Sequence, residues 1–362
     1  MPAIITLGFL SGLFAFLSRW RRTSWGLRAS FVVIFVFTAL RYNYGWDYNT
    51  YLQTFGEVRD NGLFDFNNSH DFEPAWICLN ELFCPLGFFG MIAALAFVNC
   101  LVYYHLIKTH VPVTYYWVAV CLYVFNPIFM LIQLSALRQT VAILLFLVSL
   151  EFIHKKQPIR YFLCIGLASL FHLSAVLLLP LYLLALANWN ANLASKRVTR
   201  IIVVSIFVLL FVFGLNGSLG NLLRDFVADY FERYQTYQDP GKLGTGLGFL
   251  YGTIMLVLAL FYATSPKEST SLVCRIAIIS FMLAPLTLSI ELLSRVCFYF
   301  APATLVAYPI IVQNLKAPLL RVLLLTVLFS LTFWELGVFC NGVDNQEYYG
   351  TYQTIFSASE WF

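Results

Sequence analysis

Residues 201–215 read IIVVSIFVLLFVFGL, and residues 319–334 read LLRVLLLTVLFSLTFW. Both runs are nearly continuous in apolar residues, as expected of a helix in the hydrocarbon core of a bilayer, which takes roughly 20 residues to cross. The strands of a membrane β-barrel would instead show segments of about ten residues that alternate between apolar and polar. The two runs therefore predict membrane-spanning helices.

The composition extends this prediction to the whole chain. Of the 362 residues, 60% are hydrophobic and 11% are charged, which is less than half of the charged fraction of about 25% in soluble domains. A soluble globular protein is excluded, and we expect an all-α polytopic membrane protein in which residues 1–362 form one integral membrane domain of about 11–12 transmembrane helices. The apolar runs fall at 3–17, 28–40, 86–106, 113–130, 134–153, 160–187, 200–216, 248–264, 273–290, 297–313 and 319–338.

The run at 160–187 is too long for one simple span. His172 interrupts its centre and Pro180 follows. We therefore expect a rising half that ends near Phe171 and a descending half that starts near Leu173. This division sets the direction of every later span and gives about twelve crossings.

The division also separates the charges by side. Fifteen of the 22 Lys and Arg residues fall in connections on one face, where Glu151 and Glu268 are the acidic residues. By the positive-inside rule this face is cytoplasmic and both termini point outward. The outer face receives two long loops and the tail, with short interfacial helices expected at Asp47–Phe55 and Leu219–Tyr237. The loops are 41–74 and 217–247, and the tail is 339–362.

Seven basic residues remain outside the cytoplasmic face: Arg41, Arg59, Arg138, Arg224, Arg233, Lys242 and Arg295. A charge within a span or at its outer end is unfavourable unless it faces a polar cavity, so such residues are candidate sites. Arg138 is the strongest of them, and a structural pairing with a loop acid is its alternative. Arg295 follows Glu291 by four residues, so an intrahelical ion pair competes with a functional role.

His172 is the third candidate of this kind, because it stands in the apolar stretch Phe171-His-Leu-Ser-Ala175 at the proposed outward turn. A lone histidine is usually a hydrogen-bonded core residue. Its pKa near neutrality also suits proton transfer, so both interpretations stay open.

The first outward loop combines aromatic rings with carboxylates and amides. It begins RYNYGWDYNTY at 41–51 and ends DFEPAW at 71–76. Such a mixture suits a carbohydrate, whose apolar faces stack on rings while its hydroxyls form hydrogen bonds, and it also suits an anchor at the membrane interface. Together with outward cations that can hold a diphosphate, it favours a polyprenyl-diphosphate glycan over an ordinary lipid.

Several short motifs occur in a recognisable order. They are Arg41, Asp47, Tyr48 and Tyr51, then Glu73 to Trp76, Leu137 to Gln139, Phe171 to Ala175, then Arg233, Tyr234 and Tyr237, and finally Arg295, Tyr299 and Phe300. In this order, and at outward helix ends, they resemble the EpsG-like branch of the Wzy-type polysaccharide polymerases. The resemblance spans residues 41–300.

The resemblance implies a multi-pass enzyme of the bacterial inner (cytoplasmic) membrane, with a GT-C-like architecture, periplasmic loops and an active site that faces the periplasm. Such an enzyme joins undecaprenyl-diphosphate-linked repeat units into O-antigen, which is carried on lipopolysaccharide, or into capsule or exopolysaccharide. The acceptor hydroxyl attacks the anomeric carbon of the donor glycan, and undecaprenyl diphosphate leaves. The expected partners are the donor and acceptor glycans, membrane lipid and a chain-length regulator, with no nucleic acid.

The resemblance also suggests roles for single residues. Arg138 and Arg295 would stabilise the diphosphate, assisted by Arg41 or Arg233. His172 would be the general base, with Asp47, Glu73 or Glu291 as alternatives, although Asp47 or Glu73 could instead organise the loop. The expected substrate-binding residues are Arg41, Tyr48, Tyr51, Glu73, Gln139, Arg233, Tyr237 and Tyr299.

No cofactor or metal is required by this chemistry. The eight cysteines occur singly and never as Cys-x-x-Cys, so neither a zinc site nor a disulfide framework is expected. Three other functions compete with the polymerase: an O-antigen ligase that uses the same lipid-linked donor, a polysaccharide flippase or transporter, and a membrane acyltransferase that uses His172.

Overall fold

The computed structural model describes residues 1–65, 72–186, 193–215, 247–287 and 291–357. The chain forms two compact units, one made of Met1–Leu179 with Tyr308–Phe362 and the other of Pro180–Ala307. Within the described residues the fold is helical apart from one pair of very short strands. The all-α class expected from the apolar runs is confirmed, while the prediction of a single membrane domain remains a prediction.

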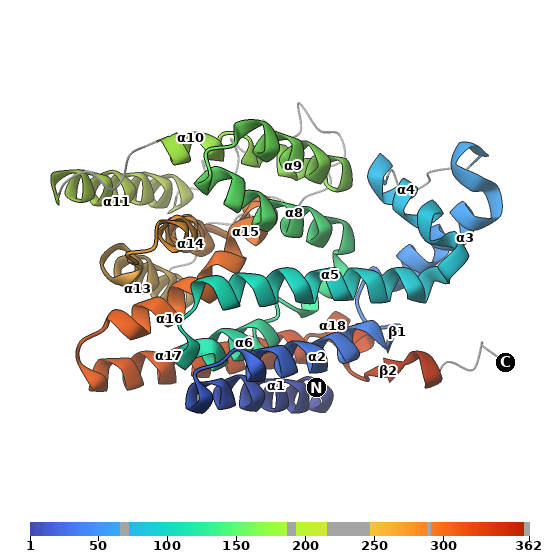
Figure 1. Cartoon of the computed structure of the whole chain (residues 1–362), viewed down its shortest axis with the longest axis horizontal. Helices are drawn as coiled ribbons and strands as arrows, with labels where there is room; N and C mark the ends of the chain where they lie inside the picture. The colour runs from blue at the N-terminus through green and yellow to red at the C-terminus, as the bar shows by residue number, and fades with distance from the viewer. Residues whose placement is uncertain (66–71, 187–192, 216–246, 288–290, 358–362) are drawn as a thin grey trace. The chain divides into compact units, whose positions relative to one another are not determined.

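A group of packed helices forms the base of the first unit. Helix α1 contacts α2 and α6, and α2 contacts α5 (Figure 1). The α1 and α2 backbones approach closely at Gly26, where a Cβ atom would lie 2.0 Å from the Phe14 carbonyl oxygen. Close approach through small residues is common between membrane helices. The elements are α1 (Pro2–Arg21), α2 (Trp25–Ala39), α5 (Gly87–His110), η2 (Val113–Tyr115) and α6 (Tyr116–Phe125).

The helices α8 (Leu137–His154) and α9 (Pro158–Phe171) pack against each other, and α8 also contacts α5. Helix α9 ends just before His172, whose backbone is extended (φ −155°, ψ 113°). The short helix η3 (Leu173–Leu178) follows, and the Tyr161 hydroxyl donates a hydrogen bond to the Leu178 carbonyl at 2.6 Å. Because Tyr161 lies near the start of α9, the chain doubles back at His172, and the expected break is confirmed.

The residues that follow α2 and α17 carry short elements instead of open loops. Helix α3 (Tyr48–Asp65) confirms the helix expected near 47–55 and extends it, with a kink at Gly62. The one expected at 219–237 lies outside the described residues. The strands pair antiparallel, with Arg41 opposite Thr354. The remaining short elements of the first unit are β1 (Arg41–Tyr42), α4 (Pro74–Phe83), η1 (Cys84–Leu86), α7 (Leu131–Ser135, which follows α6), α18 (Val343–Tyr349), β2 (Gln353–Thr354) and η6 (Ile355–Ser357).

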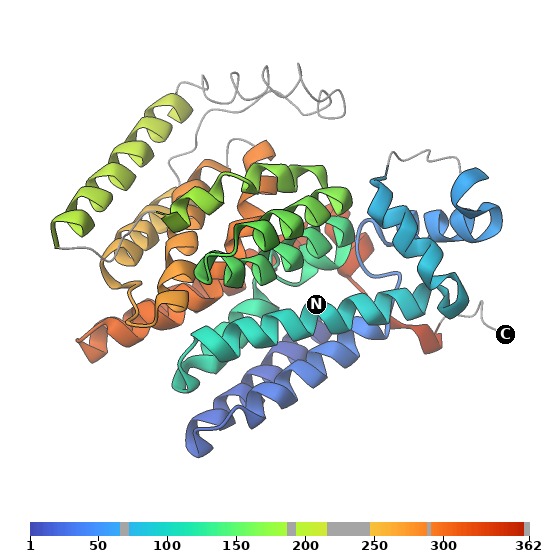
Figure 2. The same ribbon diagram turned by 45° about the horizontal axis from the view of Figure 1, so that its top comes forward.

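In the second unit, α14 contacts α11, α13 and α15. In Figure 2 the α13 and α14 helices, in golden yellow, lie side by side. The bounds are α10 (Leu181–Leu186), α11 (Leu193–Leu215), α13 (Leu247–Tyr262), α14 (Glu268–Thr287), α15 (Glu291–Phe300) and η5 (Ala301–Ala303). The chain returns to the first unit within α16 (Thr304–Asn314), which α17 (Pro318–Asn341) follows.

Five helical stretches of the described residues are long and apolar enough to cross a membrane, and shorter apolar helices accompany them. The expectation of a polytopic membrane protein is thereby supported, and each predicted apolar run falls on a helix or on consecutive helices. The count of 11–12 crossings and the GT-C-like likeness remain predictions. The five stretches are Pro2–Trp20, Pro74–His110, Leu137–His154, Ser294–Asn314 and Pro318–Asn341.

Candidate functional site

Four elements of the first unit bring ionisable and aromatic side chains together at one end. Glu73 precedes the first residue of α4, Arg138 is the second residue of α8, His172 follows the last residue of α9, and Tyr51 lies in the first turn of α3. Figure 1 shows β1, α3, α4 and α18 at this same end of the unit. The opposite end of α8 carries Lys155, one of the basic residues assigned to the cytoplasmic face.

The centre of this cluster is an ion pair between Arg138 Nη1 and Glu73 Oε2. The two side chains are 19% and 12% exposed, so the pair is largely buried but still partly accessible. The Arg138 guanidinium also lies 4.1 Å from the ring centre of Phe72, a favourable cation–π contact. The pairing with a loop acid, anticipated as the structural alternative for Arg138, is therefore present, and it fixes the guanidinium in place.

His172 lies close to the other oxygen of the Glu73 carboxylate. Its Nδ1 is 3.7 Å from Glu73 Oε1, and its side chain is 13% exposed. This separation is longer than a hydrogen bond but within the range of an ion pair when the imidazole is protonated. A carboxylate beside a histidine can orient the ring and stabilise the imidazolium that forms when the ring accepts a proton. The Glu73 carboxylate thus lies close to both Arg138 and His172.

Tyr51, in α3, contacts the Arg138 side chain. It is hydrogen-bonded to Arg138, and burial raises the pKa of its phenol to about 12, so that the hydroxyl stays protonated at neutral pH. The ring is 2% exposed, and its centre lies 4.9 Å from that of Trp76. Tyr48, expected with Tyr51 to stack on a sugar, is 1% exposed and meets the Phe88 ring edge-on. These rings pack into the aromatic core beneath the site, and their contact with substrate remains a prediction.

Two more predicted residues flank the cluster. Asp47 is exposed just before α3, and its backbone carbonyl accepts a hydrogen bond from the Tyr51 amide at 3.0 Å. Gln139 follows Arg138 directly in α8 and is 2% exposed. Both lie on elements that carry the site, which agrees with the predicted placement but does not test the predicted roles.

Arg41 lies behind the cluster and is only 1% exposed. Its Nη1 donates hydrogen bonds to the carbonyls of Tyr44 at 2.9 Å and Leu134 at 2.7 Å. Burial lowers the pKa of Arg41 to about 10, so the guanidinium remains charged at neutral pH. In this position its charge is directed to backbone carbonyls, and assistance to a diphosphate remains a prediction.

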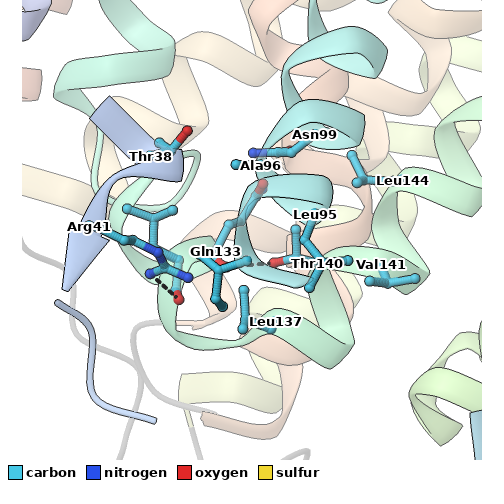
Figure 3. Close-up of a pocket in the computed structure, with 12 residues that line it drawn as sticks. Thr38, Arg41, Leu95, Ala96, Asn99, Gln133, Leu137, Thr140, Val141 and Leu144 are labelled. Atoms are coloured by element: carbon cyan, nitrogen blue, oxygen red, sulfur yellow. Dashed lines mark hydrogen bonds between the residues drawn. The ribbon is translucent and has the colours of Figure 1, made fainter. Parts of the chain in front are cut away.

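A narrow cavity lies beside Arg41, between α2, α5 and the α7–α8 segment. Figure 3 shows Arg41, Asn99 and Gln133 at this cavity, whose other polar lining residues are Thr38 and Thr140. Its volume is about 20 Å³, which is roughly the room that one water molecule needs. A cavity of this size is too small for a sugar.

The second unit holds the remaining described candidates. Arg295 and Tyr299 lie one helical turn apart in α15, and Tyr299 is 1% exposed. Glu291 begins the same helix, but its side chain lies outside the described part of the structure. Arg295 and Arg138 belong to different units, so their meeting at one diphosphate remains a prediction. Arg233 and Tyr237 lie outside the described residues.

Two hydrogen bonds made by Tyr349 in this region were not predicted from the sequence. The Tyr349 hydroxyl donates a hydrogen bond to the Leu131 carbonyl at 2.9 Å and is hydrogen-bonded to Ser135 Oγ. Both partners belong to α7, immediately before the helix that carries Arg138. The distribution of basic residues predicts that the tail lies on the same side of the membrane as the site. No spacing or periodicity in the sequence indicates the contact between Tyr349 and α7.

The described residues contain no group of three or more His, Cys, Asp or Glu side chains that could hold a metal ion. The groups that the cluster itself brings together are a guanidinium, a carboxylate and an imidazole.

The family model described as the EpsG family matches residues 25–353, nearly the whole chain. The match includes the complete described cluster as well as Arg295 and Tyr299. No curated protein and no solved structure matches the chain.

Proposed function

Because the chain belongs to the EpsG family, which is a family of Wzy-type polymerases, we propose that it joins undecaprenyl-diphosphate-linked oligosaccharide repeat units on the outer face of the bacterial inner membrane. The family points to a polymerase-type glycosyltransferase in general. The lipid-linked substrate, the periplasmic face and the products, namely O-antigen, capsule or exopolysaccharide, belong to the proposal.

The observation that carries the proposal is the position of Glu73 between Arg138 and His172. A glycosyl transfer from a lipid diphosphate needs a cation for the leaving group and a base for the attacking hydroxyl. The cluster supplies one of each, linked by a single carboxylate. Its largely buried setting strengthens both electrostatic interactions relative to water.

The reaction assigns a role to each group. The acceptor hydroxyl oxygen forms a bond to the anomeric carbon of the donor sugar, and the bond from that carbon to the diphosphate oxygen breaks. The hydroxyl proton passes to His172, and the bonding electrons leave with undecaprenyl diphosphate. Arg138 stabilises the negative charge that develops on the leaving diphosphate, which is the contribution expected to be largest.

Glu73 connects these two steps. A diphosphate that approaches Arg138 competes with Glu73 for the guanidinium, because phosphate oxygens accept the same forked hydrogen bonds as a carboxylate. The imidazolium that forms on His172 attracts the Glu73 carboxylate at the same stage of the reaction. Glu73 is thus the orienting group of the pair, and His172 is the better candidate for the base.

The placement of the cluster is consistent with an outward-facing site. Glu73, Arg138 and His172 all lie at helix ends opposite the end of α8 that carries Lys155 and Lys156. Under the positive-inside rule those lysines are cytoplasmic, so the cluster faces the periplasm. The proposed partners are the donor and acceptor glycans in the membrane and a chain-length regulator.

Deletion of the gene in its native host tests the proposed function against its competitors. A polymerase mutant should lose the ladder of chain lengths and keep a single-repeat product. A ligase mutant would accumulate long lipid-linked polymer, and a flippase mutant would accumulate single repeats that an added outer-face enzyme cannot reach. Restoration of the ladder by the wild-type chain, but not by Arg138→Ala, would support the site assigned here.

A further inference from the structure

The position of Arg138 depends on the sharp corner between α7 and α8. Helix α7 ends at Ser135, Ala136 follows with φ −84° and ψ 61°, and α8 begins at Leu137. Arg138 is only two residues beyond the corner. A small rotation of this corner would therefore move the guanidinium away from Glu73.

Three groups that are distant in sequence hold the corner. Arg41 donates to the Leu134 carbonyl at 2.7 Å, and the Trp46 amide donates to Ser135 Oγ at 2.9 Å. The Tyr349 hydroxyl is hydrogen-bonded to the same Ser135 oxygen and donates to the Leu131 carbonyl at 2.9 Å. Tyr349 and Ser135 are both 1% exposed, so water cannot readily replace these bonds.

The tail that carries Tyr349 is itself fixed to the last turns of α2 and to the strand that follows it. Tyr352 stacks on Phe37 with ring centres 4.1 Å apart, and its hydroxyl donates to the Phe37 carbonyl at 2.7 Å. Strand β2, which begins at the next residue of the chain, pairs with β1. Tyr349 therefore reaches the corner from an anchored element.

Gly45 allows this close arrangement. Its φ of 126° is unfavourable for other residues, and a Cβ atom there would lie 3.0 Å from Ser135 Oγ. The Gly45 amide also donates to the Tyr348 carbonyl at 3.3 Å. The segment after α2, the tail and the corner thus meet around one residue.

We propose that Tyr349 is a positioning residue for the transfer reaction, which acts through Ser135 and the α7–α8 corner to hold Arg138 opposite Glu73. The proposal rests on the proposed function for its kinetic consequence, but not for its structural one. The tail then belongs to the catalytic machinery although it does not touch the reacting atoms. Burial raises the pKa of Tyr349 to about 12, so its hydroxyl is a neutral donor throughout the physiological range.

The test compares Tyr349→Phe with Tyr348→Phe in the full-length protein in lipid nanodiscs. Tyr348 is a matched control because it neighbours Tyr349 and contributes its backbone carbonyl, which the substitution keeps. The first measurement is amide hydrogen exchange over residues 131–141. Exchange should become faster in Tyr349→Phe and remain at the wild-type rate in Tyr348→Phe. Unchanged exchange in Tyr349→Phe would overturn the proposal whatever reaction the protein catalyses.

The second measurement is the rate of polymer formation at varied concentrations of lipid-linked repeat units. We expect Tyr349→Phe to lower kcat about tenfold, with KM changed less than about twofold, since the interaction lost acts mainly in the transition state. A wild-type kcat in this variant, despite faster exchange, would contradict the positioning role. Absence of polymer from the wild-type chain would instead count against the proposed function, and the exchange measurement would still decide whether Tyr349 holds the corner.

A third measurement separates positioning from general destabilisation. In an Arg138→Lys background, Tyr349→Phe should cause little further loss of kcat, because the forked guanidinium that it positions is already missing. An equal loss in both backgrounds would show that Tyr349 acts independently of Arg138 and would overturn the proposal.

Discussion

The guanidinium of Arg138, at the start of α8, forms an ion pair with the carboxylate of Glu73, which lies 65 residues earlier in the chain. The pair connects a transmembrane helix with the segment that precedes α4. It also brings the carboxylate to His172. The site proposed here is built around this one contact.

Replacement of Arg138 is expected to abolish polymer formation. Arg138→Ala removes the cation assigned to the leaving diphosphate, and loss of one such electrostatic contact lowers kcat by about 10²–10³-fold. Arg138→Lys should also be impaired, because lysine cannot form the forked contact. The measurement is the chain-length ladder, with membrane insertion verified by immunoblot. Arg59→Ala is the matched control, since this arginine is 59% exposed and outside the cluster; a normal ladder from well-inserted Arg138→Ala would contradict the assignment.

Replacement of His172 tests the general base. His172→Gln keeps a polar side chain of similar length but cannot accept the proton, and loss of a general base typically lowers the rate by about 10²–10⁴-fold. The turnover of purified protein on lipid-linked repeat units is the appropriate measurement. His105→Gln serves as the control, because His105 lies on α5, toward the end where Lys108 is found. Equal turnover of the two variants would remove His172 from the mechanism.

The cluster is expected to be accessible from the periplasm. Ser174→Cys, two residues after His172, should react with a membrane-impermeant maleimide added from the periplasmic side, whereas Lys156→Cys should react only after the inner membrane is opened. Both changes belong in a Cys78→Ser background, because Cys78 is exposed. Labelling of residue 174 from the cytoplasmic side would contradict the proposed site and would favour a cytoplasmic acyltransferase.

The contribution of Tyr349 to stability should depend on pH in the alkaline range. Its folded-state pKa is raised to about 12 by burial, whereas the unfolded value is about 10. The folded state therefore retains the proton more strongly, and this stabilisation is complete below about pH 10 and decreases as the pH rises toward 12. Thermal unfolding of the wild type and Tyr349→Phe should show a constant difference in midpoint between pH 7 and 9 and a smaller difference at pH 11. A difference that grows with pH would contradict the assigned role of the hydroxyl.

Much of the fold could be predicted from the sequence because each apolar run extends over many residues. Each predicted apolar run corresponds to a helix or to consecutive helices. The break at His172 could be predicted because a polar residue interrupts an otherwise apolar segment. Glu73, Arg138 and His172 were identifiable one by one as polar groups at expected outer helix ends. Their mutual contact was foreseen only in general terms, as a pairing of Arg138 with a loop acid.

The contacts that the sequence did not reveal depend on single hydrogen bonds between distant segments. The bond between Ser135 and Tyr349 joins residues 214 positions apart, and the paired strands are two residues long. Neither produces a periodic pattern. Tyr48 and Tyr51 stand in a polar stretch of the sequence, which does not reveal that both rings are buried in the fold; their contact with substrate remains a prediction.

The central claim is that this chain transfers lipid-linked repeat units and uses Arg138 to do so. Purified wild-type protein in nanodiscs, supplied only with undecaprenyl-diphosphate-linked repeat units, tests it most directly. The account predicts a ladder of longer lipid-linked glycans, with one undecaprenyl diphosphate released for each new glycosidic bond, and loss of both products in Arg138→Ala. No ladder from folded wild-type protein, or an unchanged ladder from Arg138→Ala, would contradict it.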